Sequence, residues 1–229
     1  MRSAAQRAWE QAGEAQDHAQ SGMASGEAET QLIRALRGVL STDEGTRSAS
    51  ENLLAQLASQ RGYAAALAQA LASPDCTSPE IQQMAGSALR SFVSTHWSQS
   101  SAHFQPPLID GDERAHVLSV LLQALPAPNR KASTAVSLCI AKIAEFDWPH
   151  EWPDLTPSLA QGVWQNDDEL LRSGCMRCLS MMSEELEEPQ LSELCPNLLP
   201  TLSGIVSSWS SPSVSRDQTA GCATVLCFS

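Results

Sequence analysis

Aromatic, basic and β-branched residues are scarce in this 229-residue chain. Aromatics make up 5% of it, with a single Tyr, and 14 Lys and Arg residues stand against 26 Asp and Glu, giving a formal net charge of −12. A surface of this charge repels the phosphate backbone of nucleic acids and attracts basic proteins. The composition therefore argues against direct nucleic-acid binding and favours basic protein partners.

Two further absences bear on location. No run of about 18 uninterrupted apolar residues is present and the N-terminus has no apolar signal core, so no membrane insertion is expected. The seven cysteines are odd in number and lie within apolar helical patterns, which predicts reduced thiols in a cytosolic or nuclear protein. Residues 1–26, rich in Ala, Gln, Glu and Gly, are predicted to be a flexible leader.

Helix-forming residues are abundant, and the apolar ones recur at helical spacing in successive segments. These segments form pairs that begin near residues 27, 63, 112, 154 and 190, with a last helix starting near 214. The step of about 40 residues is typical of HEAT-type helix pairs, and no alternating strand pattern competes. The sequence thus predicts an all-α fold, an α-solenoid of antiparallel pairs over residues 27–229, as a segment of a right-handed superhelix.

Three helix starts can be predicted from capping residues. Ser41-Thr42-Asp43-Glu44 fits a capping box with Ser41 as the N-cap. Ser78 followed by Pro79 predicts a cap and a first helical residue. Asn166 is the predicted cap of the helix that continues through Leu186.

The segment Asp147-Trp148-Pro149-His150-Glu151-Trp152-Pro153 contains two Trp-Pro dipeptides at the end of an apolar helical pattern. A residue that precedes proline is pushed out of the helical region, and proline is a favourable first residue of a helix. We therefore expect a rigid corner between two helices. The two indoles could form a peptide-docking site, but at such a corner they more often fill the groove between helix pairs.

This segment, read as DWPxxWPxL through Leu155, resembles the junction between the third and fourth repeats of importin-β-superfamily nuclear transport receptors. The stretch Met84 to Trp97 is similar to the second-repeat helix of that family. His96-Trp97 and Phe104-Gln105-Pro106-Pro107 point to its importin-9-like branch. The resemblance extends over roughly residues 27 to 210.

The resemblance implies a function and partners. Receptors of this family bind the small GTPase Ran in its GTP form through their first repeats, contact nuclear pore proteins, and move between cytoplasm and nucleus. Importin-9-like receptors import basic cargo such as histones and ribosomal proteins. Candidate GTPase contacts are polar residues opposite the apolar helix faces, and a small acidic run is a candidate site for basic cargo. The GTPase candidates are Arg47, Glu51, Gln83 and Arg90, and the acidic run is Glu184, Glu185, Glu187 and Glu188.

Catalysis finds little support in the sequence. Cys175-x-x-Cys178 lies in the middle of a predicted helix on its apolar face, where core packing is favoured over a zinc or redox site. The five histidines form no HExxH pattern, and no phosphate loop or GxSxG is present. We expect a protein without cofactor that is not an enzyme, although a thiol enzyme, a generic HEAT scaffold and an exportin-type receptor stay open as alternatives.

The chain stops at Cys227-Phe228-Ser229 within an apolar pattern, without the polar capping repeat that normally closes a solenoid. The sequence is therefore expected to be the N-terminal part of a longer receptor, truncated at the C-terminus.

Overall fold

The computed structural model describes residues 23–73, 78–164, 168–186 and 192, and within these ranges the chain is helical with no strand. The predicted all-α solenoid is thereby confirmed. The predicted helices at 191–206 and from 214 lie outside the described residues, as do residues 1–22 of the leader. The helices are α2 Met23–Val39, α3 Glu44–Ala58, α4 Tyr63–Ala72, α5 Pro79–His96, α6 Gly111–Gln123, α7 Arg130–Asp147, α8 Leu155–Trp164 and α9 Glu169–Glu185.

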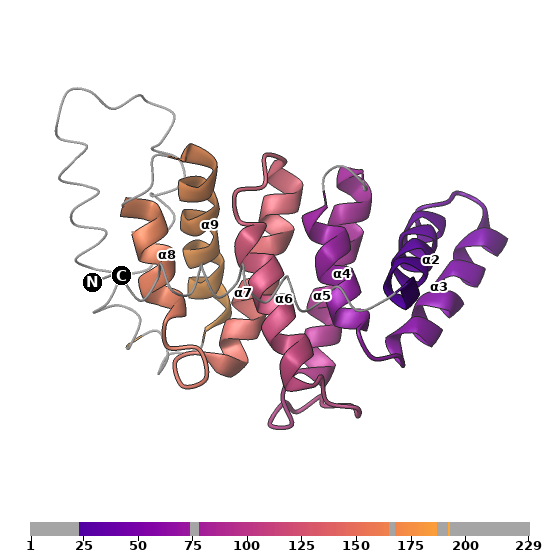
Figure 1. Ribbon diagram of the computed structural model, residues 1–229, viewed down its shortest axis with the longest axis horizontal. Coiled ribbons are helices and arrows are strands. Elements are labelled where there is room, and N and C mark those ends of the chain that lie inside the picture. The colour runs from indigo at the N-terminus through magenta and orange to yellow at the C-terminus, as the bar shows by residue number, and fades with distance from the viewer. Residues whose placement is uncertain (1–22, 74–77, 165–167, 187–191, 193–229) are drawn as a thin grey trace.

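Successive helices pair, and the pairs stand side by side from α2 and α3 at one end to α8 and α9 at the other (Figure 1). The first helices of the pairs, α2, α4, α6 and α8, form one layer. The second helices, α3, α5, α7 and α9, form another, which we call the second-helix layer. α5, α7 and α9 pack more closely on one another than α4, α6 and α8 do. Because helices on the inside of a curved array lie closer together, we infer that α5, α7 and α9 lie on the inner side of this part of the array.

A continuous apolar core fills the space between the two layers. Its largest fully buried side chains come from every described pair and include Leu36, Leu67, Leu89, Ile140 and Leu159. Each pair therefore covers its apolar face with its neighbours, as the solenoid prediction requires. α5 and α7 are packed tightly at Gly86, where a Cβ atom would lie 2.7 Å from the Cβ of Ala135.

Two of the three predicted N-caps are wrong by two residues. Asp43 caps α3, with its carboxylate accepting from the Thr46 amide at 2.7 Å, while the hydroxyl of Ser41 instead accepts from the Asp43 amide. Asp168 caps α9 by accepting from the amides of Leu170 and Leu171. A carboxylate nearer to the apolar pattern is available in both cases, and a charged acceptor also suits the positive end of the helix.

The third predicted start is correct in position. Ser78 is extended at the N-cap of α5 and Pro79 is the first helical residue, but the Ser78 side chain makes no capping hydrogen bond. The first described helix begins at Met23, four residues before the predicted start at 27.

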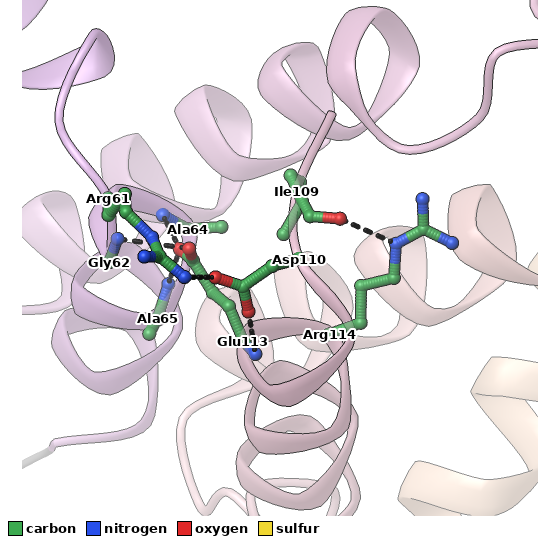
Figure 2. Close-up of polar contacts among 8 residues, drawn as sticks. All are labelled: Arg61, Gly62, Ala64, Ala65, Ile109, Asp110, Glu113 and Arg114. Carbon is green, nitrogen blue, oxygen red and sulfur yellow. Dashed lines mark hydrogen bonds and ion pairs between the residues drawn. The ribbon is translucent and has the colours of Figure 1, made fainter. Parts of the chain in front are cut away.

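The start of α4 is capped from the next pair. Gly62, at a positive φ of 85°, precedes α4. The Glu113 side chain on α6 accepts hydrogen bonds from the amides of Gly62, Ala64 and Ala65 at 3.0, 2.9 and 3.2 Å (Figure 2). One carboxylate thus satisfies three amides that the helix itself cannot pair.

Next to Glu113, Asp110 joins the same two pairs. Its carboxylate caps α6 by accepting from the Glu113 amide at 2.8 Å, and it forms an ion pair with Arg61 (Figure 2). The hydrogen bond from Arg61 holds the pKa of Asp110 below its ordinary value. Both residues are solvent-exposed enough that this ion pair contributes little to stability.

The Trp-Pro segment forms the corner between α7 and α8, as predicted. Trp148 is extended and buried, 4% exposed, and belongs to the core, while Trp152 is partly buried against it. Nearby, the indole of Trp97 donates to the Asp147 carboxylate at 2.9 Å, and the Arg114 guanidinium lies over the Trp97 ring at 5.1 Å. The ends of α5 and α7 are therefore tied to the start of α6.

Candidate functional site

A groove of about 620 Å³ lies between α5 and α7 on the second-helix layer. α5 contributes one polar wall because every third or fourth residue from Gln83 onward faces away from the core. The α7 wall begins at the first residue of that helix. The groove is lined by Gln83, Gly86, Ser87, Arg90, Ser91, Ser94, Arg130, Lys131, Thr134, Ala135, Leu138 and Lys142.

All charged residues that line the groove are basic, although the chain carries a net charge of −12. Arg90 comes from α5, and Arg130, Lys131 and Lys142 come from α7. Arg130 and Lys131 are exposed and occupy the first turn of α7, where unpaired backbone amides already give a partial positive charge. Cations in that position lower the stability of the helix, because they add to the positive potential of the amides. The first turn of α7 is therefore a region of concentrated positive potential.

Arg177 on α9 extends this positive region. Its guanidinium donates to the Ser133 hydroxyl on α7. Partial burial, and then the charge of Arg130, lower the pKa of Arg177 below the ordinary Arg value. The second cause shows that Arg130 and Arg177 lie close enough to repel each other.

The other two cations of the groove, Arg90 and Lys142, form ion pairs. Arg90 pairs with Glu185 at the end of α9, so that these two residues connect helices that each pack on α7. Lys142 pairs with Glu145 at 2.5 Å and also lies 5.5 Å from the Phe146 ring centroid. Two cations are thus compensated and two, Arg130 and Lys131, have no ion pair among the described residues.

The four predicted GTPase contacts fall into two groups. Gln83 and Arg90 line the groove together on α5. Glu51 is exposed and Arg47 half-buried on α3, which packs mainly on α2 and makes only a small contact with α4. The neighbouring Gln82 is not part of this surface: it is 4% exposed and donates to the Leu71 carbonyl at 3.0 Å.

The predicted acidic run is only partly described. Glu184 is exposed, and Glu185 is half-buried because it pairs with Arg90. Glu187 and Glu188 lie outside the described residues. As a site for basic cargo, the run stays a prediction.

Cys175 and Cys178 are buried in the core. Burial raises the pKa of Cys175 to about 12 and that of Cys178 well above its ordinary value, so neither is a thiolate near neutral pH. His96 packs on Phe92 and its Nδ1 lies 2.7 Å from the Gln105 carbonyl, which is a packing and capping role.

Within the described residues, no group of three or more His, Cys, Asp or Glu side chains is arranged to hold a metal ion. Among the helices described here, none has the length and apolar character needed to cross a membrane.

Sequence reasoning missed Arg130, Lys131 and Lys142 as groove residues. A signal was present: Asn129 is a good N-cap, and two cations directly after an N-cap oppose the helix dipole. What could not be read from the sequence is that this turn lies opposite the polar face of α5.

Comparisons with known proteins agree with this architecture. Residues 50–126 match the family model of the importin-beta N-terminal domain. The chain is 27% identical over 172 residues to importin subunit beta-5 of Schizosaccharomyces pombe and 26% identical over 180 residues to importin-9 of Drosophila melanogaster. These alignments cover 74% and 77% of the chain but only 17% of each relative, so the chain spans about a sixth of their length.

Solved structures show the same fold. Yeast importin-beta, Kap95p, superposes with a TM-score of 0.71 at 20% identity, over 89% of this chain and 24% of that one. The exportin Cse1 in its cargo-free, cytoplasmic state superposes with a TM-score of 0.65 at 15% identity, over 79% and 20% of the two chains. An importer and an exporter thus share this arrangement of helices.

Proposed function

Since the chain belongs to the importin-β superfamily, as a segment of a nuclear transport receptor, we propose that it binds the GTP form of the small GTPase Ran and helps to carry basic proteins into the nucleus. The observation that supports this best is the polar surface of α3 and α5 within and beside the matched domain. Arg47, Glu51, Gln83 and Arg90 lie on these two helices, away from the core.

The proposed GTPase contact has two separate parts, one on α3 and one on α5. α3 stands at the end of the second-helix layer and α5 is flanked by α7. A globular partner that contacted both would touch Arg47 and Glu51 at one edge and Gln83 at the other. Such a partner would add contacts between helices that barely touch in the free chain, and would thereby restrain the curvature of the array.

Basic cargo is proposed from charge. The net charge of −12 speeds encounter with basic proteins, and Glu184 is an exposed carboxylate at the end of α9. We place such cargo, for instance histones or ribosomal proteins, toward α9 and the GTPase toward α3 and α5. If the GTPase and the cargo favour different curvatures of the array, binding of Ran-GTP in the nucleus would release the cargo there, which is import. The receptor would work in cytoplasm and nucleus and contact nuclear pore proteins.

The test is the affinity of the protein for Ran loaded with GTP and for Ran loaded with GDP, measured by calorimetry. We expect a preference for the GTP form of about tenfold or more, equivalent to about 1.4 kcal/mol. Equal affinity for both forms, in protein shown by circular dichroism to be helical, would contradict the proposal.

Single substitutions locate the contact. Arg47→Ala, Glu51→Ala and Gln83→Ala are each expected to weaken Ran-GTP binding by about three- to tenfold if they lie at the contact. Glu169→Ala on α9 is the matched control, because Glu169 is exposed and lies outside residues 50–126. A control that loses as much affinity as the three variants would remove the assignment to α3 and α5.

Cargo coupling separates import from export. A histone dimer released on addition of Ran-GTP supports import, whereas a dimer bound more tightly in its presence would overturn the import proposal.

A further inference from the structure

We propose that the groove between α5 and α7 is a docking site for an acidic, extended protein segment, a partner different from the basic cargo and from the GTPase, whose proposed contact shares Gln83 and Arg90 on the α5 wall of the groove. The four charged side chains that line it, Arg90, Arg130, Lys131 and Lys142, are all cations in an acidic chain.

The cations of the groove that form no ion pair among the described residues lie at the first turn of α7. Arg130 and Lys131 are exposed, form no ion pair with the described residues, and sit in a helix turn whose amides add positive potential. Arg177 on α9 donates to the Ser133 hydroxyl on α7 and is close enough to Arg130 for the two charges to repel each other. Neighbouring cations repel one another and lower the stability of the free protein. A carboxylate that binds among them relieves this repulsion and is attracted by all three charges.

Acidic groups that face the region do not neutralise it. Glu185 is paired with Arg90 and Glu145 with Lys142, so neither carboxylate is available to Arg130 or Lys131. Glu80, on the first turn of α5, is exposed and close enough to Lys131 to feel its charge, but forms no ion pair with it. One exposed carboxylate therefore faces three cations.

The dimensions of the groove fit a short strand of peptide. The lining residues of α5 run from Gln83 to Ser94, which is about 17 Å along a helix axis. An extended peptide of about five residues covers this distance. Carboxylates on such a peptide can meet Arg130 and Lys131, while Ser87, Ser91 and Thr134 offer hydroxyl groups to its backbone.

Protein carboxylates suit this groove better than a nucleic acid. None of the lining residues is aromatic, so bases have no ring on which to stack. The net charge of −12 also repels a long polyanion, whereas a short acidic segment interacts with the groove alone within the screening length of about 8 Å.

Fluorescence anisotropy with a labelled oligoglutamate peptide of about eight residues tests the proposal on the 229-residue protein. Binding is expected at about 50 mM salt and is expected to weaken strongly at about 300 mM, since the groove is open to solvent. Oligoglutamine and oligolysine peptides of the same length should not bind it. Absence of oligoglutamate binding at low salt would overturn the proposal.

Two double variants with the same change of charge identify the site. R130Q/K131Q should weaken oligoglutamate binding by about five- to thirtyfold, since each exposed charge contributes modestly. R34Q/R37Q removes two exposed cations on α2, outside the groove, and should leave binding unchanged. An equal loss in both variants would mean attraction without a site, and would overturn the proposal.

Two further arms complete the test. The conservative variant R130K/K131R should retain binding, which separates loss of charge from loss of fold. Oligothymidylate of similar length should displace the peptide only at higher concentration; displacement at lower concentration would assign the groove to nucleic acid instead. Glu51→Ala, a proposed GTPase contact on α3 outside the groove, should leave oligoglutamate binding unchanged, so that failure of this proposal and failure of the GTPase proposal are distinguishable.

Discussion

Arg90 and Glu185 form an ion pair although they are 95 positions apart and lie on helices separated by α7. On the basis of the sequence, Arg90 is a candidate GTPase contact and Glu185 a candidate contact for basic cargo. In the structure each is the other's partner, so Arg90, which lines the groove, is joined to the end of α9. Any ligand that uses one of these side chains has to compete with the other.

The strength of this ion pair can be measured by a double-mutant cycle with R90Q, E185Q and the combined variant. The pair is partly exposed, so we expect a coupling free energy of unfolding of about 0.5–1 kcal/mol that falls with added salt. The measurement is urea denaturation. A coupling that does not change with salt would argue against a direct ion pair.

Trp148→Ala should lower the free energy of unfolding by about 3–5 kcal/mol, because the indole is buried at the corner between α7 and α8. Trp152→Ala is the matched comparison and should cost less, since Trp152 is only partly buried. Thermal melting of both variants checks this. An unchanged melting curve for the Trp148 variant would point to an exposed tryptophan available for docking.

Glu113→Ala should destabilise the protein by about 1–2 kcal/mol, because three amides at the start of α4 lose their acceptor. Glu113→Gln should cost less, as its amide oxygen can still accept. Glu51→Ala, on the exposed side of α3, serves as the control for removal of a carboxylate. Hydrogen exchange should show the loss at Ala64 and Ala65 first, and unaltered exchange there would contradict this capping role.

Gly174→Ala should destabilise by about 1–3 kcal/mol, because its Cβ would collide with the Leu125 backbone carbonyl, which cannot move away as a side chain can. Gly45→Ala is the control, since its Cβ would meet only the Asp43 carboxylate at 3.5 Å. It should be neutral or slightly stabilising, because alanine favours helix more than glycine does. Denaturation midpoints of the two variants should therefore move apart.

Asp147 provides a pH dependence. Burial raises the pKa of Asp147 above its ordinary value, against the hydrogen bond from Trp97 and the charge of Arg114, which lower it. The folded protein therefore holds the proton more tightly than the unfolded chain, so this contribution to stability is full at acid pH and is lost as pH rises through the folded pKa. The stability difference between wild type and Asp147→Asn should shift in favour of the variant as pH rises toward neutral.

Melting temperatures of the two proteins across this pH range give the test. The asparagine oxygen can still accept from Trp97, so the variant keeps the hydrogen bond while losing the titration. A difference that is constant with pH would show that the carboxylate is not desolvated.

The helices could be predicted from sequence because their pattern is local. Apolar spacing predicts pair starts near residues 63, 112 and 154, within one residue of the first residues of α4, α6 and α8, since each helix must bury one face. Caps were less predictable: Ser41 and Asn166 fit the rule as well as Asp43 and Asp168 do, and only the hydrogen bonds formed decide between them.

The groove could not be predicted because it depends on neighbours in space. Gln82 and Gln83 are adjacent and chemically identical, yet one is buried against the end of α4 and the other lines the groove. Arg130 and Lys131 belong to a positively charged groove only because α5 and Arg177 lie next to them in space. Periodicity gives the faces of a helix; which helix lies opposite is a property of the array.

The Glu113 cap has a consequence for how the array assembles. The amides that begin one pair are satisfied by a side chain of the following pair, so the order of α4 depends on α6 being in place. Contacts of this kind make neighbouring repeats melt together and lengthen the cooperative unit beyond a single pair. Pulling on the array, or losing a pair from it, would then release structure in steps larger than one repeat.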